Sequence, residues 1–234
     1  MIVSHKYRYI FIKPYKVAGT SIEVALAEHC GESDIVTPVT KYSEKFDAEE
    51  YVHEPRNYEG FRNHMLPKDI KAKVGDTIWK DYYKFTVVRN PWDQLISRYY
   101  WEREFSWFKI RRNIVNILSH PFRLKLYLNL LGKLKMRINL SSFKLFIINL
   151  KQSWLNTNFY FDENGEKVCD YYIRYEHLEE DFRSVCKLLG FSDIHLPKLK
   201  SKTRKHKHSV NYTDKQYKKV FNMCRLEIER FNYK

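Results

Sequence analysis

The chain has 234 residues, with 42 Lys and Arg against 28 Asp and Glu, which gives a formal net charge of +14 at pH 7. This length suits one domain with a well-buried core, and no Pro-, Ser- or Gly-rich linker divides it, so we expect a single domain over residues 1–234. The positive charge indicates an anionic partner: a nucleotide, an acidic glycan, a nucleic acid or a membrane surface. Charge alone does not choose among these partners.

The cysteines and the apolar runs indicate a compartment. The chain has four cysteines: Cys30, Cys169, Cys186 and Cys224. They form no C-x-x-C pair, and no His stands at zinc spacing from them. We therefore expect them to be reduced, packed thiols without a metal. The first residues carry no apolar signal region, and no apolar run approaches the ~20 residues that span a bilayer. We therefore expect a soluble, cytoplasmic protein without a transmembrane segment.

The first motif is a strand that runs into a turn and a helix. Residues 10–12 favour a buried strand and helical spacing restarts at Ser21, so the turn is predicted to begin at Lys16. Backbone N–H groups at a helix start attract anions, and Gly19 lets a ligand approach the backbone closely. Lys16 adds a charge, while Thr20 and Ser21 add hydroxyl donors. The turn is therefore a candidate anion site.

A nucleotide phosphate loop has the form G-x-x-x-x-G-K-[ST], but here Lys16 stands three residues before the only glycine of the turn. The arrangement K-V-A-G-T-S resembles instead the 5′-phosphosulfate loop of sulfotransferases that use 3′-phosphoadenosine 5′-phosphosulfate (PAPS). The resemblance implies that Lys16 is catalytic, bridging the phosphate and the transferred sulfuryl group. It also implies nucleotide contacts for the whole loop: Lys16, Val17, Ala18, Gly19, Thr20 and Ser21. Alone, the motif fits an ordinary turn with a solvated Lys equally well.

A second strand, turn and helix follow. Residues 84–88 predict a strand, and Pro91 opens a helix predicted over 92–103. The stretch K-F-T-V-V-R-N-P-W-D-Q-L-I-S-R-Y-Y closely resembles the 3′-phosphate motif of the same family. There, an Arg at the strand end and a Ser eight positions later bind the 3′-phosphate, and Arg89 and Ser97 stand at these positions. The two motifs together make chance a poor explanation.

The resemblance extends over nearly the whole chain. It implies an α/β fold in which helices flank a central, mainly parallel sheet, the P-loop-like sulfotransferase fold. We also expect a short strand at 34–37, a loop over 40–60 that covers the substrate, and a short helix after Leu66. A strand at 169–175, a helix at 176–189 and a last helix at 213–231 complete the prediction.

Two further regions supply candidate nucleotide contacts. Arg174, in a strand that resembles the family, is either a nucleotide contact or a surface partner of Glu176 or Glu179. Residues 198–208 form a basic run, which is typical of a solvated loop or a nucleic-acid or localisation patch. In sulfotransferases a basic loop in this place folds over the phosphates of the nucleotide. The resemblance therefore adds three candidates: Lys202, Arg204 and Lys205.

Residues 105–161 contain no Asp or Glu but ten Lys or Arg. Apolar residues at helical spacing predict helices on both sides of Pro121, and residues 141–154 resemble a helix of carbohydrate sulfotransferases. The segment is either helical core with solvated basic faces, a basic wall for an anionic acceptor, or an amphipathic face on anionic lipid. We favour core and acceptor wall over lipid, because polar and apolar residues are not cleanly segregated.

Sulfuryl transfer requires positive charge at the leaving phosphate and a base at the acceptor hydroxyl. Lys16 can supply the charge without a metal ion. For the base, His64 stands where related glycan sulfotransferases have a His in the acceptor cleft, and an unperturbed imidazole titrates near ~6.5. A surface or capping His is the alternative interpretation of His64. His53 is the second candidate base.

The implied activity is transfer of the sulfuryl group of PAPS to a hydroxyl of a carbohydrate, including an anionic one. A nucleotide kinase is disfavoured by the position of Lys16 and by the lack of a clear Mg²⁺ carboxylate. A non-catalytic protein that binds nucleic acid or membrane is supported by charge alone. We expect no nucleic-acid partner, and peripheral membrane contact stays open. Animal Golgi sulfotransferases carry an N-terminal anchor, so we expect a bacterial or viral protein, or a chain trimmed of its anchor.

Overall fold

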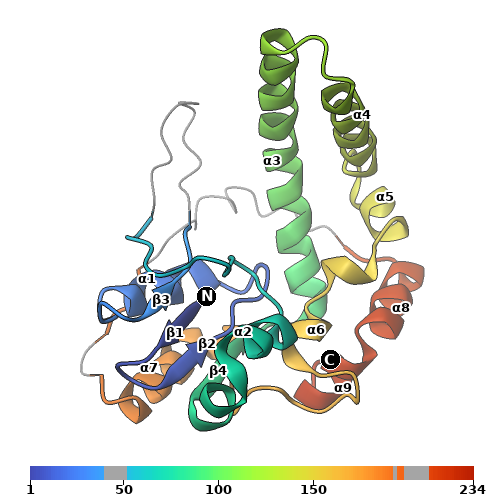
Figure 1. Cartoon of the computed structure of the whole chain (residues 1–234). Helices are drawn as coiled ribbons and strands as arrows, with labels where there is room; N and C mark the ends of the chain where they lie inside the picture. Colours follow the sequence, from blue (N-terminus) through green and yellow to red (C-terminus); the bar gives the residue numbers. More distant parts are fainter. Residues whose placement is uncertain (40–51, 192–193, 198–210) are drawn as a thin grey trace. The chain divides into compact units, whose positions relative to one another are not determined.

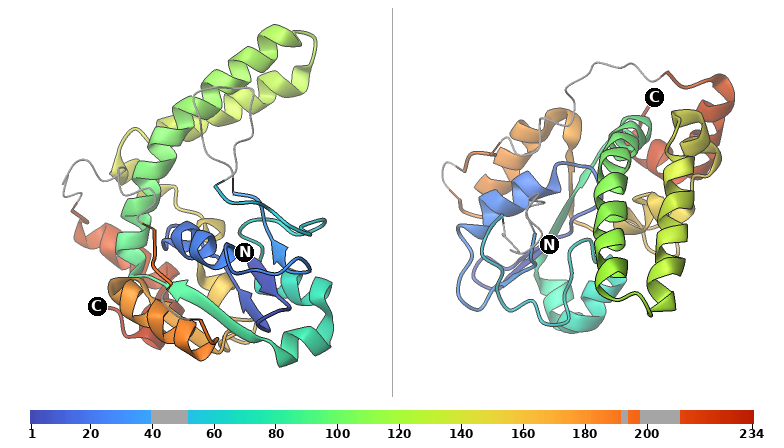
Figure 2. Two further views of the ribbon diagram at one scale, coloured as in Figure 1. Left: turned by 90° about the vertical axis from the view of Figure 1, so that its left-hand side faces the viewer. Right: turned by 90° about the horizontal axis from the view of Figure 1, so that it is seen from above.

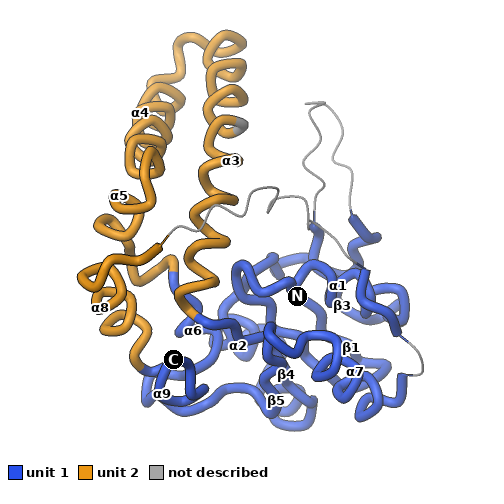
Figure 3. The backbone as a smooth tube through the Cα atoms, turned by 180° about the vertical axis from the view of Figure 1, so that it is seen from behind, with its two compact units in different colours: residues 1–90, 155–201, 226–234 blue, residues 91–154, 202–225 orange. Residues whose placement is uncertain are grey.

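The structure is a computed structural model that describes residues 1–39, 52–191, 194–197 and 211–234, and its elements can be followed in Figures 1 and 2. The chain divides into two compact units (Figure 3). Unit 1 comprises residues 1–90, 155–201 and 226–234, and unit 2 comprises residues 91–154 and 202–225. That the chain folds as one domain stays a prediction.

Unit 1 is built on a five-stranded sheet of order β3-β1-β2-β4-β5. The strands are β1 (Ile2–Ser4), β2 (Tyr9–Phe11), β3 (Ile35–Val36), β4 (Tyr83–Val88) and β5 (Tyr171–Arg174). β2, β4 and β5 are parallel, whereas β1 pairs antiparallel with both β2 and β3. The α/β class with a central sheet is therefore confirmed. The sheet is mixed rather than mainly parallel because β1, which was not predicted, forms a hairpin with β2.

Helices cover both faces of this sheet. They are α1 (Gly19–Ala27), α2 (Pro67–Asp81), α6 (Thr157–Tyr160), α7 (Leu178–Leu188) and α9 (Arg225–Phe231), with a 3-10 turn at Tyr175–His177. α2 continues beyond its predicted end because the chain kinks at Gly75, whose φ of 82° lies in the region that favours glycine, and then resumes a helix.

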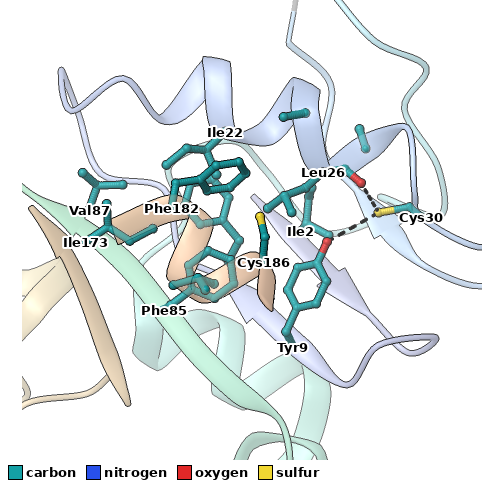
Figure 4. Packing of buried hydrophobic residues seen from close by; sticks show 14 of the residues in the cluster. Ile2, Tyr9, Ile22, Leu26, Cys30, Phe85, Val87, Ile173, Phe182 and Cys186 are labelled. Atoms are coloured by element: carbon teal, nitrogen blue, oxygen red, sulfur yellow. Dashed lines mark hydrogen bonds between the residues drawn. The ribbon is translucent and has the colours of Figure 1, made fainter. Parts of the chain in front are cut away.

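Alternating side chains of the strands build one buried cluster on each face. On one face, Tyr9 and Phe11 of β2 and Phe85 of β4 pack with α1 and α7 (Figure 4). On the other face, Ile10 of β2 packs with residues of α2, α6 and α9, among them Phe231. Successive strand residues point to opposite faces, so the continuous apolar runs that predicted buried strands fill both clusters. The parallel strands then end at one edge, where the candidate site begins.

Unit 2 is helical. It contains α3 (Pro91–Ser119), α4 (Leu124–Asn139), α5 (Phe143–Ile148), a 3-10 turn at Gln152–Trp154 and α8 (Asp214–Met223). Aromatic rings join α3 to α5: the centroid of the Tyr99 ring lies 5.3 Å from that of Phe143 and 5.5 Å from that of Phe146. α3 runs on beyond residue 103 and stops two residues before Pro121, which confirms the predicted break.

Some sequence-based predictions need correction. The last helix is not continuous, because a break at Cys224 separates α8 from α9. α4 contains no buried residue, so the core interpretation of the acid-free segment is wrong for this helix. All four cysteines are buried and none forms a disulfide. Among the helices of the described residues, none combines the length and the apolar character needed to cross a membrane.

Candidate active site

The loop between β2 and α1 forms the predicted strand-to-helix turn. Lys16 and Ala18 both have left-handed backbone, each with a φ of 61°, and α1 begins at Gly19. Such a conformation costs an L-residue roughly 1–2 kcal/mol, and strain of this kind is common in ligand-binding loops. The helix N-cap is Ala18, whose methyl side chain cannot accept a hydrogen bond from the first turn. The Ser21 amide donates to the Ala18 carbonyl oxygen at 3.0 Å, so the amides that precede it, those of Gly19 and Thr20, are the ones suited to an anion.

Gly19 is required by packing. A Cβ atom built on Gly19 would lie 2.7 Å from Cγ of Lys13, closer than real Cβ atoms come to other atoms. Lys13 is 2% exposed, and its ammonium group forms an ion pair with Glu23 of α1. The missing side chain of Gly19 thus makes room for a buried lysine. Close approach of a ligand to this glycine stays a prediction.

A cluster of buried charges lies beneath the loop. Glu23 is fully buried. Its carboxylate accepts hydrogen bonds from the amino group of Met1 at 2.5 Å and from the Thr37 hydroxyl at 3.0 Å, besides the one from Lys13. Burial opposes the charged carboxylate, but the positive charges of Lys13 and of the Met1 amino group lower the pKa of Glu23 to about 2. Neither Lys13 nor Glu23 was predicted from the sequence. The sequence does carry one sign of these two residues, because each is a single charged residue within an otherwise apolar stretch.

His64 is held against the same cluster. Its Nδ1 lies 3.0 Å from the backbone carbonyl oxygen of Lys13, and its ring stacks on Tyr15 with centroids 4.1 Å apart. A carbonyl oxygen only accepts, so Nδ1 carries the proton and Nε2 presents the lone pair. Burial and, next, the charge of Lys13 lower the pKa of His64 to about 3. The imidazole is therefore neutral at physiological pH, and the expected titration near 6.5 does not apply.

Tyr15 is fixed by a residue far away in sequence. The backbone N–H of Tyr15 donates to Oδ1 of Asn156 at 3.1 Å, and Nδ2 of Asn156 donates back to the Tyr15 carbonyl at 2.8 Å. Asn156 is buried and precedes α6. This reciprocal pair holds the ring on which His64 stacks. No local pattern marked Asn156, because the two residues stand 141 positions apart.

Arg89 joins the second motif to the first. It follows β4, is 4% exposed, and donates from Nη1 to the backbone carbonyl oxygen of Lys16 at 2.7 Å. Its guanidinium also lies 3.8 Å from the centroid of the Tyr175 ring. The structure therefore brings together the loop predicted for the 5′-phosphosulfate and the arginine predicted for the 3′-phosphate.

The remaining candidates are placed differently. Ser97 is half-buried in α3 and belongs to unit 2, whereas Arg89 belongs to unit 1, so their shared ligand stays a prediction. Arg174 donates from Nη2 to the Phe231 carbonyl at 2.8 Å, which places it against the C-terminal residues rather than on Glu176 or Glu179. The clamp candidates lie outside the described residues, as does much of the predicted covering loop: Lys202, Arg204, Lys205 and residues 40–51.

His53 lies beside the buried cluster. Its Nε2 is 4.0 Å from Oε1 of Glu23, and burial, partly offset by the charge of Glu23, lowers its pKa. Both candidate bases thus border the pair of Lys13 and Glu23, His64 at the Lys13 backbone and His53 at the Glu23 carboxylate. Within the part of the chain that the structure describes, no three His, Cys, Asp or Glu side chains gather as a metal site.

Comparison with known proteins agrees with this arrangement. A model of the sulfotransferase family matches residues 1–234, the whole chain. No curated protein and no solved structure matches the chain significantly. The match confirms what the loop at Lys16 and the turn at Arg89 indicated, and it is consistent with a sheet flanked by helices. The chain, whose two motifs meet at one edge of that sheet, belongs to the sulfotransferase family, a family of enzymes that transfer sulfuryl groups.

Proposed function

We propose that this sulfotransferase moves the sulfuryl group of PAPS to a hydroxyl group of a carbohydrate. The observation that carries the proposal is the hydrogen bond from Arg89 to the carbonyl of Lys16, because it joins the two elements predicted to bind phosphate. PAPS carries charge at both its 5′-phosphosulfate and its 3′-phosphate, and it would occupy both elements. The first amides of α1 and Lys16 would hold the former, and Arg89 with Ser97 the latter.

The reaction is an in-line displacement at sulfur. A bond forms between the acceptor oxygen and sulfur while the bond between sulfur and the 5′-phosphate oxygen breaks, which releases adenosine 3′,5′-bisphosphate. Negative charge grows on the leaving phosphate, and Lys16 together with the amides of α1 stabilises it. In this proposal Lys16 supplies the positive charge for which phosphoryl-transfer enzymes use a metal ion.

His64 would take the acceptor proton at Nε2. The Lys13 carbonyl fixes the tautomer and Tyr15 fixes the ring, so the lone pair has one direction. The low pKa of about 3 belongs to the protein without ligands. An anionic donor bound nearby would raise this pKa, because negative charge favours the imidazolium. The base would therefore strengthen when the donor is in place.

A carbohydrate acceptor is supported by the resemblance of residues 141–154 to carbohydrate sulfotransferases and by the position of His64. The cytoplasm is the proposed compartment, supported by four buried cysteines outside disulfides.

The test supplies PAPS with a panel of neutral and acidic oligosaccharides and measures release of adenosine 3′,5′-bisphosphate. We expect release that depends on one class of glycan. Release only with phenols or lipid alcohols would overturn the carbohydrate part of the proposal. Thermal unfolding with the bisphosphate and with ATP–Mg²⁺ tests the donor: a ligand at ~100 times its Kd adds ~2.7 kcal/mol of stability. An equal or larger shift with ATP–Mg²⁺ would favour a kinase.

A further inference from the structure

The helical hairpin of α3 and α4 exposes apolar side chains at its tip. The two helices run side by side and are joined by a short turn (Figures 1 and 2). The largest apolar side chains around the turn are almost wholly in water: Phe122 is 100% exposed, Leu118 75% and Leu124 72%. We call residues 118–128 the hairpin tip. A protein normally exposes large apolar residues singly, so this cluster requires a partner or a function.

The exposed apolar residues continue along both helices as stripes. In α4, Tyr127, Leu131, Leu134 and Ile138 are exposed and recur every three or four residues, which places them on one face. In α3 the exposed residues Trp107, Ile114 and Leu118 stand seven and four positions apart, which also places them on one face. When each helix is followed from its N-terminus to its C-terminus, the stripe lies on the same rotational side of the residues that face the other helix. Because the helices are antiparallel, both stripes then lie on one side of the hairpin.

The contact between the two helices is partly polar. Asn113 of α3 donates from Nδ2 to the Leu126 carbonyl at 2.8 Å and accepts from Nζ of Lys133 at 2.6 Å. Arg137 of α4 donates to the Ser106 hydroxyl at 3.1 Å. A hairpin that served only as scaffold would turn its leucines inward and its lysines outward. Here several leucines face water while polar groups take part in the contact between the helices.

The charge of the segment selects the partner. Residues 105–161 contain ten Lys or Arg and no Asp or Glu, and Arg123 and Lys125 are exposed within the tip itself. A second copy of the chain would bring positive charge against positive charge. A sulfated glycan would pair with the basic groups but leave the leucines in water. An anionic phospholipid surface satisfies both, since its phosphates take the cations and its acyl boundary takes the apolar side chains.

We propose that the hairpin tip is a peripheral membrane-binding element for anionic phospholipid. Phe122, Leu118 and Leu124 enter the boundary between headgroups and acyl chains, while Arg123 and Lys125 contact the headgroup phosphates. Binding would be in the plane of the interface, without spanning it. The element belongs to unit 2, and the proposal is independent of the identity of the sulfuryl acceptor.

The experiment is co-sedimentation of the full chain with vesicles of phosphatidylcholine, with and without phosphatidylserine. We expect binding to the anionic vesicles that weakens with salt. The apolar variant Leu118→Ser/Phe122→Ser/Leu124→Ser should lower the partition coefficient about tenfold or more. Arg123→Glu/Lys125→Glu should lower it by a similar factor and flatten its salt dependence. The matched controls are the exposed residues of α7, Leu188→Ser and Lys187→Glu, which should bind as the wild type does.

A second readout reports insertion. The four native cysteines are buried, so a Phe122→Cys variant can be labelled selectively with a polarity-sensitive fluorophore. Its emission should shift to the blue on anionic vesicles. Unchanged thermal unfolding and unchanged affinity for adenosine 3′,5′-bisphosphate would show that each variant is folded.

Several results would overturn the proposal. The first is a wild type that fails to bind anionic vesicles, and the second is that both tip variants bind them as strongly as the wild type does. The third such result is a fluorophore whose emission does not shift on bound protein. Concentration-dependent dimerisation lost in the apolar variant, without vesicle binding, would assign the face to a second copy. Acceptor KM raised by the tip variants, again without vesicle binding, would assign it to a glycan.

Discussion

The Arg89 guanidinium donates a hydrogen bond to the backbone carbonyl oxygen of Lys16 at 2.7 Å, across 73 residues of sequence. The same guanidinium packs on the Tyr175 ring, so three segments of unit 1 meet at this arginine. Arg89 is thereby both a candidate phosphate ligand and a support for the backbone of the loop. Because Arg89 has both roles and Ser97 only the first, we expect substitutions of these two residues to affect nucleotide binding differently.

Arg89→Ala should weaken binding of both adenosine 3′,5′-bisphosphate and adenosine 5′-monophosphate, because it also removes the support of the Lys16 loop. Ser97→Ala should weaken mainly the bisphosphate, since a serine hydroxyl contacts only the 3′-phosphate in the proposed site. Loss of a hydrogen bond to a charged group costs about 1.5–3 kcal/mol, roughly a 10- to 150-fold change in Kd. Calorimetric titration of both ligands checks this. Equal losses for the two ligands in Ser97→Ala would contradict the assignment.

Lys16→Ala should lower kcat far more than it weakens binding of the product bisphosphate. Lys16 is expected to meet charge that develops on the leaving phosphate, so its effect is largest in the transition state. Steady-state kinetics and titration with the bisphosphate measure the two quantities. Lys16→Arg is the matched variant that keeps the charge. Parallel loss of turnover and product affinity in Lys16→Ala would instead make Lys16 a uniform binding residue.

His64→Asn should lower kcat by ~10²–10⁴-fold and leave nucleotide affinity intact. Asparagine can still donate to the Lys13 carbonyl but has no basic lone pair, so this variant separates the base from the structural role. In the wild type without ligands, the NMR signals of the His64 ring should not shift between about pH 5 and 8, because its pKa is about 3 and the imidazole is already neutral. A titration near ~6.5 that is absent from the variant would show that the ring titrates as a solvated histidine.

Lys13→Met should destabilise the protein by about 3–5 kcal/mol, because it leaves the Glu23 carboxylate buried without its lysine. The double variant Lys13→Met/Glu23→Gln should be more stable than Lys13→Met alone, since the uncompensated charge is gone. Denaturant unfolding measures both. Strict additivity of the single changes would mean that the two side chains do not interact. Lys71→Met, at an exposed position in α2, is the control for loss of a lysine.

Glu227→Gln should stabilise the protein at alkaline pH. Glu227 of α9 is buried, and burial raises its pKa from 4.5 to about 7, although the Thr157 hydroxyl donates to Oε1 at 2.5 Å. The folded state thus binds the proton more tightly than the unfolded state, and stability is lost as pH rises from about 4.5 through 7. Glutamine keeps the acceptor without the charge.

The melting temperature of Glu227→Gln should therefore exceed that of the wild type by several degrees near pH 8 and match it near pH 5. Glu163→Gln, at an exposed position, is the control and should change neither value. An equal gain at both pH values would show that the effect comes from packing and not from the charge.

Local sequence was sufficient to predict the two strand–turn–helix motifs, because each consists of an apolar strand, a turn and a helix start in one short stretch of the chain. It was sufficient for the family and for the α/β class, and it marked His64 as a candidate base. It did not predict β1, since three residues are too few to show a period. It also suggested an ordinary pKa for His64, because the burial of the ring and the charge of Lys13, which lower this pKa, arise when another segment packs against it.

Only the tertiary structure decided which distant residues support the site and which apolar residues stay exposed. The pairing of Lys13 with Glu23 and of Tyr15 with Asn156 cannot be read from either segment alone, because it forms only when separate segments pack together. The leucines of α4 have the spacing of a core helix. A periodic pattern specifies that a helix has an apolar face. What covers that face depends on the neighbours that the fold supplies, and in the part of the chain that the structure describes no residue of α4 is buried.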